Sequence, residues 1–283
     1  MKKSHNSFPL HGWIGLFLTL FCWILNWGLS GTRTHYLFFG LWLGYCLTID
    51  GLTFWRRGSS PLRRSWKTYI ALFILSAPLW WLFEAINQRL QNWHYIGTSQ
   101  FSNLSFSLWA TLNFMTVIPA VFGTAEFARS FPFIQRLPQG PRISPTRSVT
   151  IAFFLSGWLM FGLMWKYPRI FFPFVWISLY FILEPLNIWL GNPNLANYTD
   201  HRDWRPVLSL WIGVLICGFF WEMWNYYSNP KWIYTIPWGH WMKIFEMPIL
   251  GYGGYLPFSL ELYAMAHLVS GFWGRKKALI ELQ

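Results

Sequence analysis

The chain has 283 residues, of which 54% are hydrophobic, 22% are aromatic and only 11% are charged. So few charged residues leave too little polar surface for a soluble globule of this size, and the long apolar runs predict an all-α, polytopic membrane protein. The formal net charge of +12 does not indicate nucleic-acid binding, because the basic residues are distributed as in a membrane protein of fixed orientation.

Eight segments each approach the roughly 20 apolar residues that a helix needs to cross a bilayer. They cover about residues 12–29, 36–55, 68–88, 105–126, 148–165, 170–191, 207–227 and 247–273. With the amino terminus in the cytoplasm, the outer segments hold only six of the 22 Lys and Arg residues, namely Arg33, Arg89, Lys166, Arg169, Lys231 and Lys243. This asymmetry predicts a multi-pass protein of the cell inner (cytoplasmic) membrane with both termini cytoplasmic.

A motif with a carboxylate, an amide three residues later and a Trp-x-Tyr pair occurs twice. The copies are Glu84, Asn87, Trp93 and Tyr95, and Glu222, Asn225, Trp232 and Tyr234. Upstream, Asp50 aligns with Glu184 in the same order. The correspondence predicts two tandem four-helix repeats, 1–127 and 148–283, joined by a cytoplasmic linker rich in Pro and Arg at 128–147. Since each half crosses four times, the repeats have parallel orientation.

Seven of the ten acidic residues lie in or beside apolar segments: Asp50, Glu84, Glu126, Glu184, Glu222, Glu246 and Glu261. A carboxylate in hydrocarbon is costly, so each is expected to be neutral, paired with a cation or wetted by a cavity. Basic partners at membrane depth are few, which favours neutral acids held by amides, hydroxyls or indoles. Glu84 and Asn87 share a helix face, as do Glu222 and Asn225, so each amide is expected to orient its acid. The alternative is that such polar pairs only join neighbouring helices, each contributing about 0.6–2 kcal/mol.

The segment from residue 243 to 265 has an unusual composition. Pro248, Pro257 and the glycines at 251, 253 and 254 interrupt its apolar run and predict a broken or re-entrant helix. Two acids flank the break and two tyrosines lie within it, beside the expected position of Glu222 and Asn225. The alternative is a glycine-lined helix crossing that needs close approach.

An enzyme acting on a lipidic substrate would use a buried acid as proton donor, an amide to hold it and aromatic walls around the apolar chain. The candidate catalytic residues are Glu222, Glu246, Glu84, Asn225 and Asn87. The candidate substrate-binding residues are Tyr252, Tyr255, Trp232, Tyr234, Trp93, Tyr95, Glu261, Asp50 and Glu184. The aromatic residues also suit an ordinary interfacial girdle. No cofactor or metal site is predicted, since no two histidines have metal-ligand spacing.

The repeated helices, the two Trp-x-Tyr pairs and the elements Glu184-Pro185 and Glu246-Met247-Pro248 resemble the small integral-membrane lycopene cyclases and related carotenoid-pathway proteins. The resemblance covers the second and third helix of each half, and a doubled acid after proline, associated with that family, is absent. It implies a duplicated bundle whose membrane carboxylates protonate a polyene, in a cyclase, isomerase or hydratase reaction.

Two other functional classes remain open. A transporter or proton-coupled carrier would use the outer acids and the inner acids as stations along a path. A structural or pigment-binding subunit would use the aromatic residues for packing and the acids to join helices. A phosphate-binding glycine loop and a Gly-x-Ser-x-Gly motif are absent from the sequence, which disfavours nucleotide-driven pumping and serine-hydrolase chemistry. The predicted partners are membrane lipids and a lipidic small molecule, with no nucleic acid.

Overall fold

The computed structural model describes residues 7–31 and 33–282. The first half contains α1 (Leu10–Gly28), α2 (Arg33–Arg57), α3 (Pro61–Arg64), α4 (Trp66–Leu90), β1 (Trp93–Ile96), α5 (Asn103–Phe114), α6 (Val117–Arg129) and α7 (Pro132–Gln135). The second contains α8 (Arg147–Lys166), α9 (Pro168–Phe171), a 3-10 helix (Phe172–Trp176), α10 (Ser178–Trp189), α11 (Ala196–Asp200), α12 (Arg205–Tyr226), β2 (Lys231–Tyr234), β3 (Lys243–Ile244), β4 (Met247–Pro248) and α13 (Ile249–Phe272). Lys2 and Lys3, predicted to be cytoplasmic, lie outside the described residues.

Within the described residues, six helical segments are long and apolar enough to cross a membrane: α1, α2, α4, α5 with α6, α8 and α12. The helices over 168–176 and 178–189 meet at a bend of 41° and make a seventh if they form one span. The all-α, membrane-like bundle is thus confirmed. The eighth predicted segment is α13, which is not one of these spans, so the count of eight stays a prediction.

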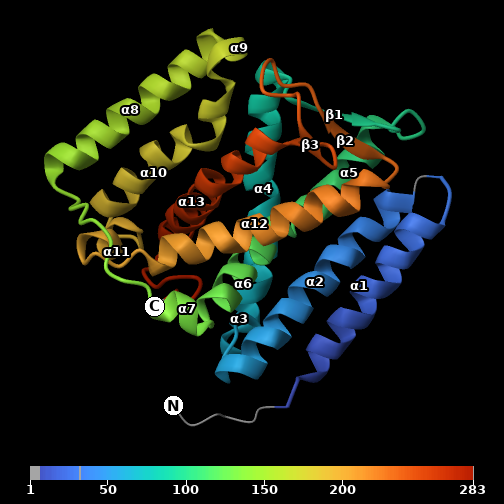
Figure 1. The fold of residues 1–283 in the computed structure, drawn as a ribbon, viewed down its shortest axis with the longest axis horizontal. Coiled ribbons are helices and arrows are strands. Elements are labelled where there is room, and N and C mark those ends of the chain that lie inside the picture. Colours follow the sequence, from blue (N-terminus) through green and yellow to red (C-terminus); the bar gives the residue numbers. More distant parts are fainter. Residues whose placement is uncertain (1–6, 32, 283) are drawn as a thin grey trace.

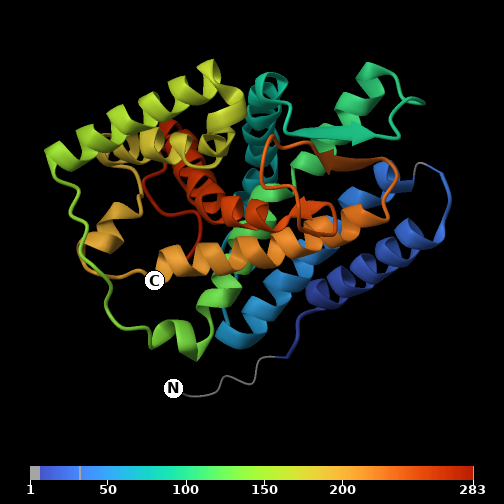
Figure 2. The ribbon, with the colours of Figure 1, turned by 45° about the horizontal axis from the view of Figure 1, so that its top comes forward.

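Two helices lie at opposite edges of the bundle, α1 in blue and α8 in yellow-green (Figure 1; Figure 2). Each packs mainly on one neighbouring helix, α1 on α2 and α8 on α10. In the 18-residue apolar stretch of each helix, only 22% is buried within the protein for α1 and 17% for α8. Such exposed apolar surface is compatible with a lipid environment and not with water.

Helices α1 and α2 approach closely because glycines face each other across their contact. A Cβ atom added at Gly15 would lie 2.6 Å from the backbone nitrogen of Thr48, and one at Gly44 would lie 2.7 Å from the carbonyl oxygen of Gly15. Small residues let helix backbones pack at this range inside a membrane, where van der Waals contact drives association.

The predicted break in the last apolar segment is not observed. Residues 249–272 form one helix, α13, with Pro257 inside it, and the irregular part of the segment is the short β3–β4 hairpin that precedes this helix. The lost backbone hydrogen bond at a proline is tolerated where the surrounding helices pack against the site. The prolines and glycines therefore mark the entry to α13 and its close contacts rather than a re-entrant loop.

The linker between the halves is irregular over residues 136–146, as expected from its prolines. It is nevertheless attached to α11 and the turn that follows. The backbone nitrogen of Ile143 donates to the carbonyl of Thr199 (3.2 Å), and Asp200 accepts hydrogen bonds from Ser144 (2.6 Å) and Arg142 (2.9 Å). One carboxylate and backbone hydrogen bonds thus join the linker to the second half.

The attachment at Asp200 is expected to depend on pH. The hydrogen bonds from Ser144 and Arg142 lower the pKa of Asp200 below its usual value. A lowered pKa in the folded state contributes stability that is present above the unfolded value of about 3.9 and is lost as the pH falls through the folded value. Hydrogen-exchange protection of residues 140–146 should therefore decrease below about pH 4. Asp200→Asn should remove this pH dependence, and an unchanged profile in that variant would assign it to another group.

Candidate functional site

The two copies of the repeated motif meet at one end of the bundle. Strand β1 from the first half pairs antiparallel with β2 from the second (Figure 1). The register places Trp93 opposite Tyr234 and Tyr95 opposite Trp232. Each residue of one Trp-x-Tyr pair therefore faces the non-equivalent residue of the other, as a local two-fold axis requires. Segments about 140 residues apart in the sequence thus form one structure.

The two repeated amides hold these strands to their helices. The side chain of Asn87 donates to the carbonyl of Trp93 (2.8 Å) and accepts from the backbone nitrogen of Asn92 (2.8 Å). Asn225 likewise donates to the carbonyl of Trp232 (2.8 Å) and accepts from the nitrogen of the same residue (2.9 Å). The expectation that each amide orients its neighbouring acid is therefore wrong. The amides act on the backbone, which leaves the acids to aromatic donors.

Glu84 is held by three aromatic side chains that converge on one oxygen. Oε1 accepts hydrogen bonds from the hydroxyl of Tyr95 (2.6 Å) and from the indole nitrogens of Trp80 (3.0 Å) and Trp93 (3.1 Å). The side chain is 7% exposed. Hydroxyl and indole donors thus take the place of a cation, as expected from the sequence.

Glu222 is fully buried and is held by two phenols. Its Oε1 accepts from the hydroxyls of Tyr234 (2.7 Å) and Tyr255 (2.8 Å), while Oε2 has no hydrogen-bond partner among the described residues. Trp232 donates its indole N–H to the phenol oxygen of Tyr234 (2.9 Å). The second copy therefore repeats the carboxyl–aromatic contact of the first with a different set of donors.

The phenols of the strands keep their protons at neutral pH. Burial, followed by the neighbouring Glu222, raises the pKa of Tyr234 well above its usual value. Burial and Glu84 have the same effect on the pKa of Tyr95. Both hydroxyls are therefore hydrogen-bond donors rather than phenolates.

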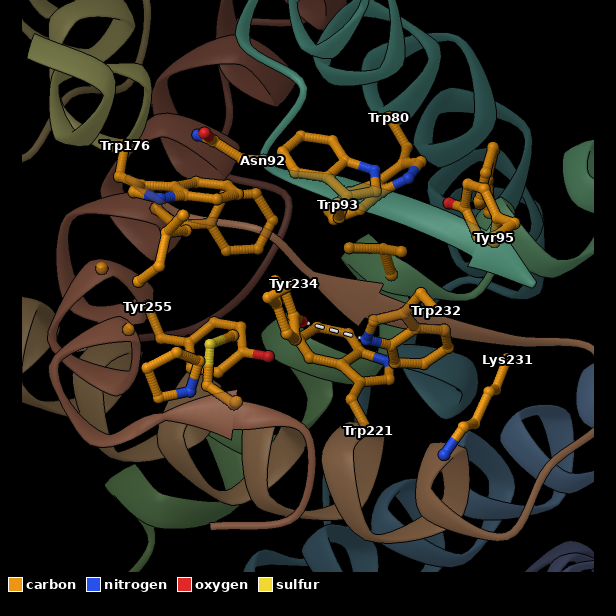
Figure 3. Close-up of a pocket in the computed structure, with 18 of the residues that line it drawn as sticks. Trp80, Asn92, Trp93, Tyr95, Trp176, Trp221, Lys231, Trp232, Tyr234 and Tyr255 are labelled. Carbon is orange, nitrogen blue, oxygen red and sulfur yellow. Dashed lines mark hydrogen bonds between the residues drawn. The ribbon is translucent and has the colours of Figure 1, made fainter. Parts of the chain in front are cut away.

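A cavity of about 430 Å³ lies between the two strands, α5, the 3-10 helix and the start of α13. Trp80, Trp93 and Trp176 line one side, and Trp221, Tyr234 and Tyr255 line the opposite side (Figure 3). The rings of Trp93 and Trp176 are stacked with centroids 5.9 Å apart. The volume of the cavity and its predominantly apolar, aromatic walls are typical of small-molecule sites.

Five of the predicted substrate-binding residues line this cavity: Trp93, Tyr95, Trp232, Tyr234 and Tyr255. The carboxyls of Glu84 and Glu222 lie directly behind these phenols. Glu246 instead forms an ion pair with Lys231, which also lines the cavity. Tyr252 is outside the lining and donates to the carbonyl of Ile244 (3.2 Å). The position predicted for Tyr255, beside Glu222, is confirmed.

The structure does not bring the other three predicted acids to the cavity. Asp50 accepts from the backbone nitrogen of Leu62 (2.9 Å), and Glu184 accepts from that of Ala196 (2.9 Å), each twelve residues downstream. Glu261 accepts from the backbone nitrogen of Leu179 (3.0 Å) at the start of α10. A carboxylate at free N–H groups of a helix start satisfies backbone donors. These three acids therefore hold chain segments in place.

Other cavity residues had no signal in the sequence. Trp80 and Trp176 are two of 22 tryptophans and belong to no repeated position. Gly218 occupies the place in the second copy that Trp80 occupies in the first, four residues before the acid. The space that Gly218 leaves by having no side chain can be recognised only when the two copies are compared in the structure.

Among the described residues, no three His, Cys, Asp or Glu side chains cluster in a way that could hold a metal ion. Comparisons of the chain with protein-family models, with curated proteins and with solved structures give no match. The functional argument therefore depends on the geometry of the cavity and its two carboxyls.

Proposed function

We propose that the protein is an integral membrane enzyme that acts on a lipidic, isoprenoid-like substrate by acid–base chemistry with buried carboxyl groups. The observation that supports this most directly is the link between the aromatic cavity and its acids. Tyr95, Tyr234 and Tyr255 line the cavity, and each donates a hydrogen bond to a carboxyl group, Glu84 or Glu222. The apolar part of a substrate would contact rings while acidic groups lie one hydrogen bond away.

The aromatic walls suit a reaction in which positive charge develops on a hydrocarbon. Protonation of a carbon–carbon double bond leaves a carbocation, which the faces of Trp and Tyr rings stabilise through their quadrupoles. Trp176 stacks on Trp93, and Phe258 meets the Trp176 ring edge to face at 5.6 Å. A cyclase, isomerase or hydratase reaction fits this environment.

The same arrangement argues against a carrier. A proton or substrate path would need the inner acids as stations, but Asp50 and Glu184 bind backbone N–H groups and do not line the cavity. Glu126, another of the acids away from the cavity, is paired with Arg64. A scaffold role would leave no reason for three phenols to connect a cavity to two buried carboxyls.

The proposal includes two tandem four-helix repeats in the inner membrane, with both termini cytoplasmic. The equivalent bonds of Asn87 and Asn225 and the two-fold register of β1 and β2 support a duplication. Arg57 at the end of α2 and Arg129 at the end of α6 are grouped with the basic segment that follows α13, since they donate to the carbonyls of Glu281 and Leu282. This group lies away from the strands, which supports an outer location for the cavity (Figure 1). The resemblance to lycopene cyclases makes a linear polyene the first substrate to test.

Binding of a linear polyene should be measurable by quenching of tryptophan fluorescence in the purified protein. Replacing Trp176 by Ala removes a stacked cavity wall, and the loss of one large buried aromatic contact is expected to weaken binding by about 1–3 kcal/mol, roughly 5–150-fold. Trp158→Ala is the matched control, since Trp158 lies on α8, is 52% exposed and is not part of the lining. Product analysis of the same mixtures by chromatography tests conversion. Saturable binding that Trp176→Ala leaves unchanged would contradict the site.

A further inference from the structure

The two carboxyls beside the cavity are held by different kinds of donor. Glu84 accepts two indole N–H bonds and one phenol, whereas Glu222 accepts two phenols. The difference originates at two aligned positions. The indole of Trp93 donates to Glu84, whereas that of Trp232 donates to the hydroxyl oxygen of Tyr234. Where α4 has Trp80, α12 has Gly218, and the ring of Tyr255 from α13 occupies the vacant space. A Cβ atom at Gly218 would lie 2.6 Å from Cε2 of that ring.

This exchange of donors changes the chemistry available to each acid. An indole N–H donates a hydrogen bond but cannot accept one, so it cannot pass a proton on. A phenol hydroxyl both donates and accepts. Two of the three hydrogen bonds to Glu84 therefore come from groups that cannot relay a proton. Both bonds to Glu222 lead to groups that can relay one.

The two phenols on Glu222 also differ from each other. The oxygen of Tyr234 already accepts the indole N–H of Trp232, which fixes Tyr234 as a donor to Glu222. In the described part of the chain, no indole donates to the oxygen of Tyr255. Tyr255 lines the cavity, and Figure 3 shows its hydroxyl pointing toward Tyr234 and Trp221. Tyr255 thus combines contact with the acid and contact with the cavity.

We infer that Glu222 and Tyr255 form the proton-exchanging unit of the cavity, and that Glu84 is a fixed positioning group for β1. The substrate part of this inference rests on the proposed function. In the transfer, the hydrogen bond between Tyr255 and Glu222 reverses its direction. The hydroxyl of Tyr255 turns to the cavity and gives its proton to the substrate carbon as the double bond opens, and Glu222 donates its carboxyl proton to the phenol oxygen. The substrate becomes a cation, Glu222 becomes a carboxylate and Tyr255 is unchanged. Loss of a proton from the product cation along the same route restores the acid.

A matched pair of phenol variants tests this assignment without any substrate. The neutral carboxyl C=O band of Glu222 should be visible in infrared difference spectra after transfer from H2O to D2O. Tyr255→Phe should slow its exchange at least tenfold, while Tyr95→Phe, which removes the phenol that donates to Glu84, should leave the rate unchanged. Glu84→Gln should retain the band and Glu222→Gln should remove it. A band that disappears in Glu84→Gln, or exchange that Tyr255→Phe leaves unchanged, would overturn the assignment.

A second test uses the space at Gly218 and keeps both hydroxyls and acids in the chain. Gly218→Ala should displace the Tyr255 ring and slow the exchange as Tyr255→Phe does. Gly162→Ala is the matched control, because an added Cβ there meets no atom within 4 Å. Slow exchange in the control as well would contradict a local effect. If exchange follows the prediction but no polyene binds or reacts, the substrate proposal fails while the proton unit stands.

Discussion

Glu222→Gln is expected to lower turnover of a bound polyene by about 10²–10⁴-fold, the range for loss of a general acid, with little change in the dissociation constant. Glutamine keeps a carbonyl oxygen that accepts from Tyr234 and Tyr255, so the cavity wall keeps its shape. It carries no acidic proton, so the transfer through Tyr255 loses its proton source. Rate constants from single-turnover reactions and affinities from fluorescence quenching separate the two effects.

Glu281→Gln is the control for this measurement. Its carboxylate is half exposed and pairs with Arg57 and Arg64 at the opposite end of the bundle. Its turnover should match that of the unmodified protein. Unchanged turnover in Glu222→Gln would remove Glu222 from the mechanism. An equal loss of affinity and turnover would instead show that the substitution deforms the cavity.

The positions of the helices could be predicted from the sequence because the bilayer sets their length. The segment predicted at about 207–227 is α12, Arg205–Tyr226, and the one at about 148–165 is α8, Arg147–Lys166. Each apolar run had to contain enough residues to cross hydrocarbon. The unbroken α13 was predicted wrongly, since glycine and proline count against a helix in isolation. Packing of α13 against α10 and α12 overrides this local preference.

The site could be predicted in part because its motif is duplicated. Comparing the copies identified Glu84, Glu222 and the two Trp-x-Tyr pairs, which the structure brings to one cavity. The pairing of β1 with β2 could not be predicted, because antiparallel contact between strands so far apart leaves no local signal. For the same reason the sequence assigned the amides to the acids. An acid three residues away is the nearest polar partner that the sequence shows, whereas the strand that each amide actually binds is known only from the structure.

The inner acids illustrate a further limit. An acid in an apolar segment indicates that something satisfies it. For Asp50 the partners are His11 on α1 (3.0 Å) and, after a turn, the backbone nitrogen of Leu62. Ser60 adds a third hydrogen bond at 2.7 Å. Such capping depends on where the chain reverses, which composition does not specify. A functional candidate and a structural cap therefore look alike until the turn is known.

Glu126→Ala should cause the largest loss of stability among single substitutions of the acids. Glu126 has no exposed surface and receives two hydrogen bonds from Arg64, at 2.7 and 2.8 Å, with Arg57 at 3.7 Å. Removing one partner of a buried pair leaves uncompensated charge, at a typical cost of about 3–5 kcal/mol. Because Arg64 is about a quarter exposed, water partly compensates, and we expect about 3 kcal/mol. Thermal unfolding in detergent measures the difference.

The same substitution should release the end of the chain. Glu126 accepts a hydrogen bond from the backbone nitrogen of Glu281 (3.2 Å), and Leu279, Ile280 and Leu282 beside it are buried. Limited proteolysis should therefore cut residues 275–282 faster in Glu126→Ala. Glu281→Ala removes an acid that contacts the same arginines from a half-exposed position, where an ion pair contributes about 0–1 kcal/mol. Equal destabilisation by both substitutions would mean that only the total negative charge near the arginines matters for stability. A large effect of Glu126→Ala alone would show that the buried carboxyl holds this end of the bundle together.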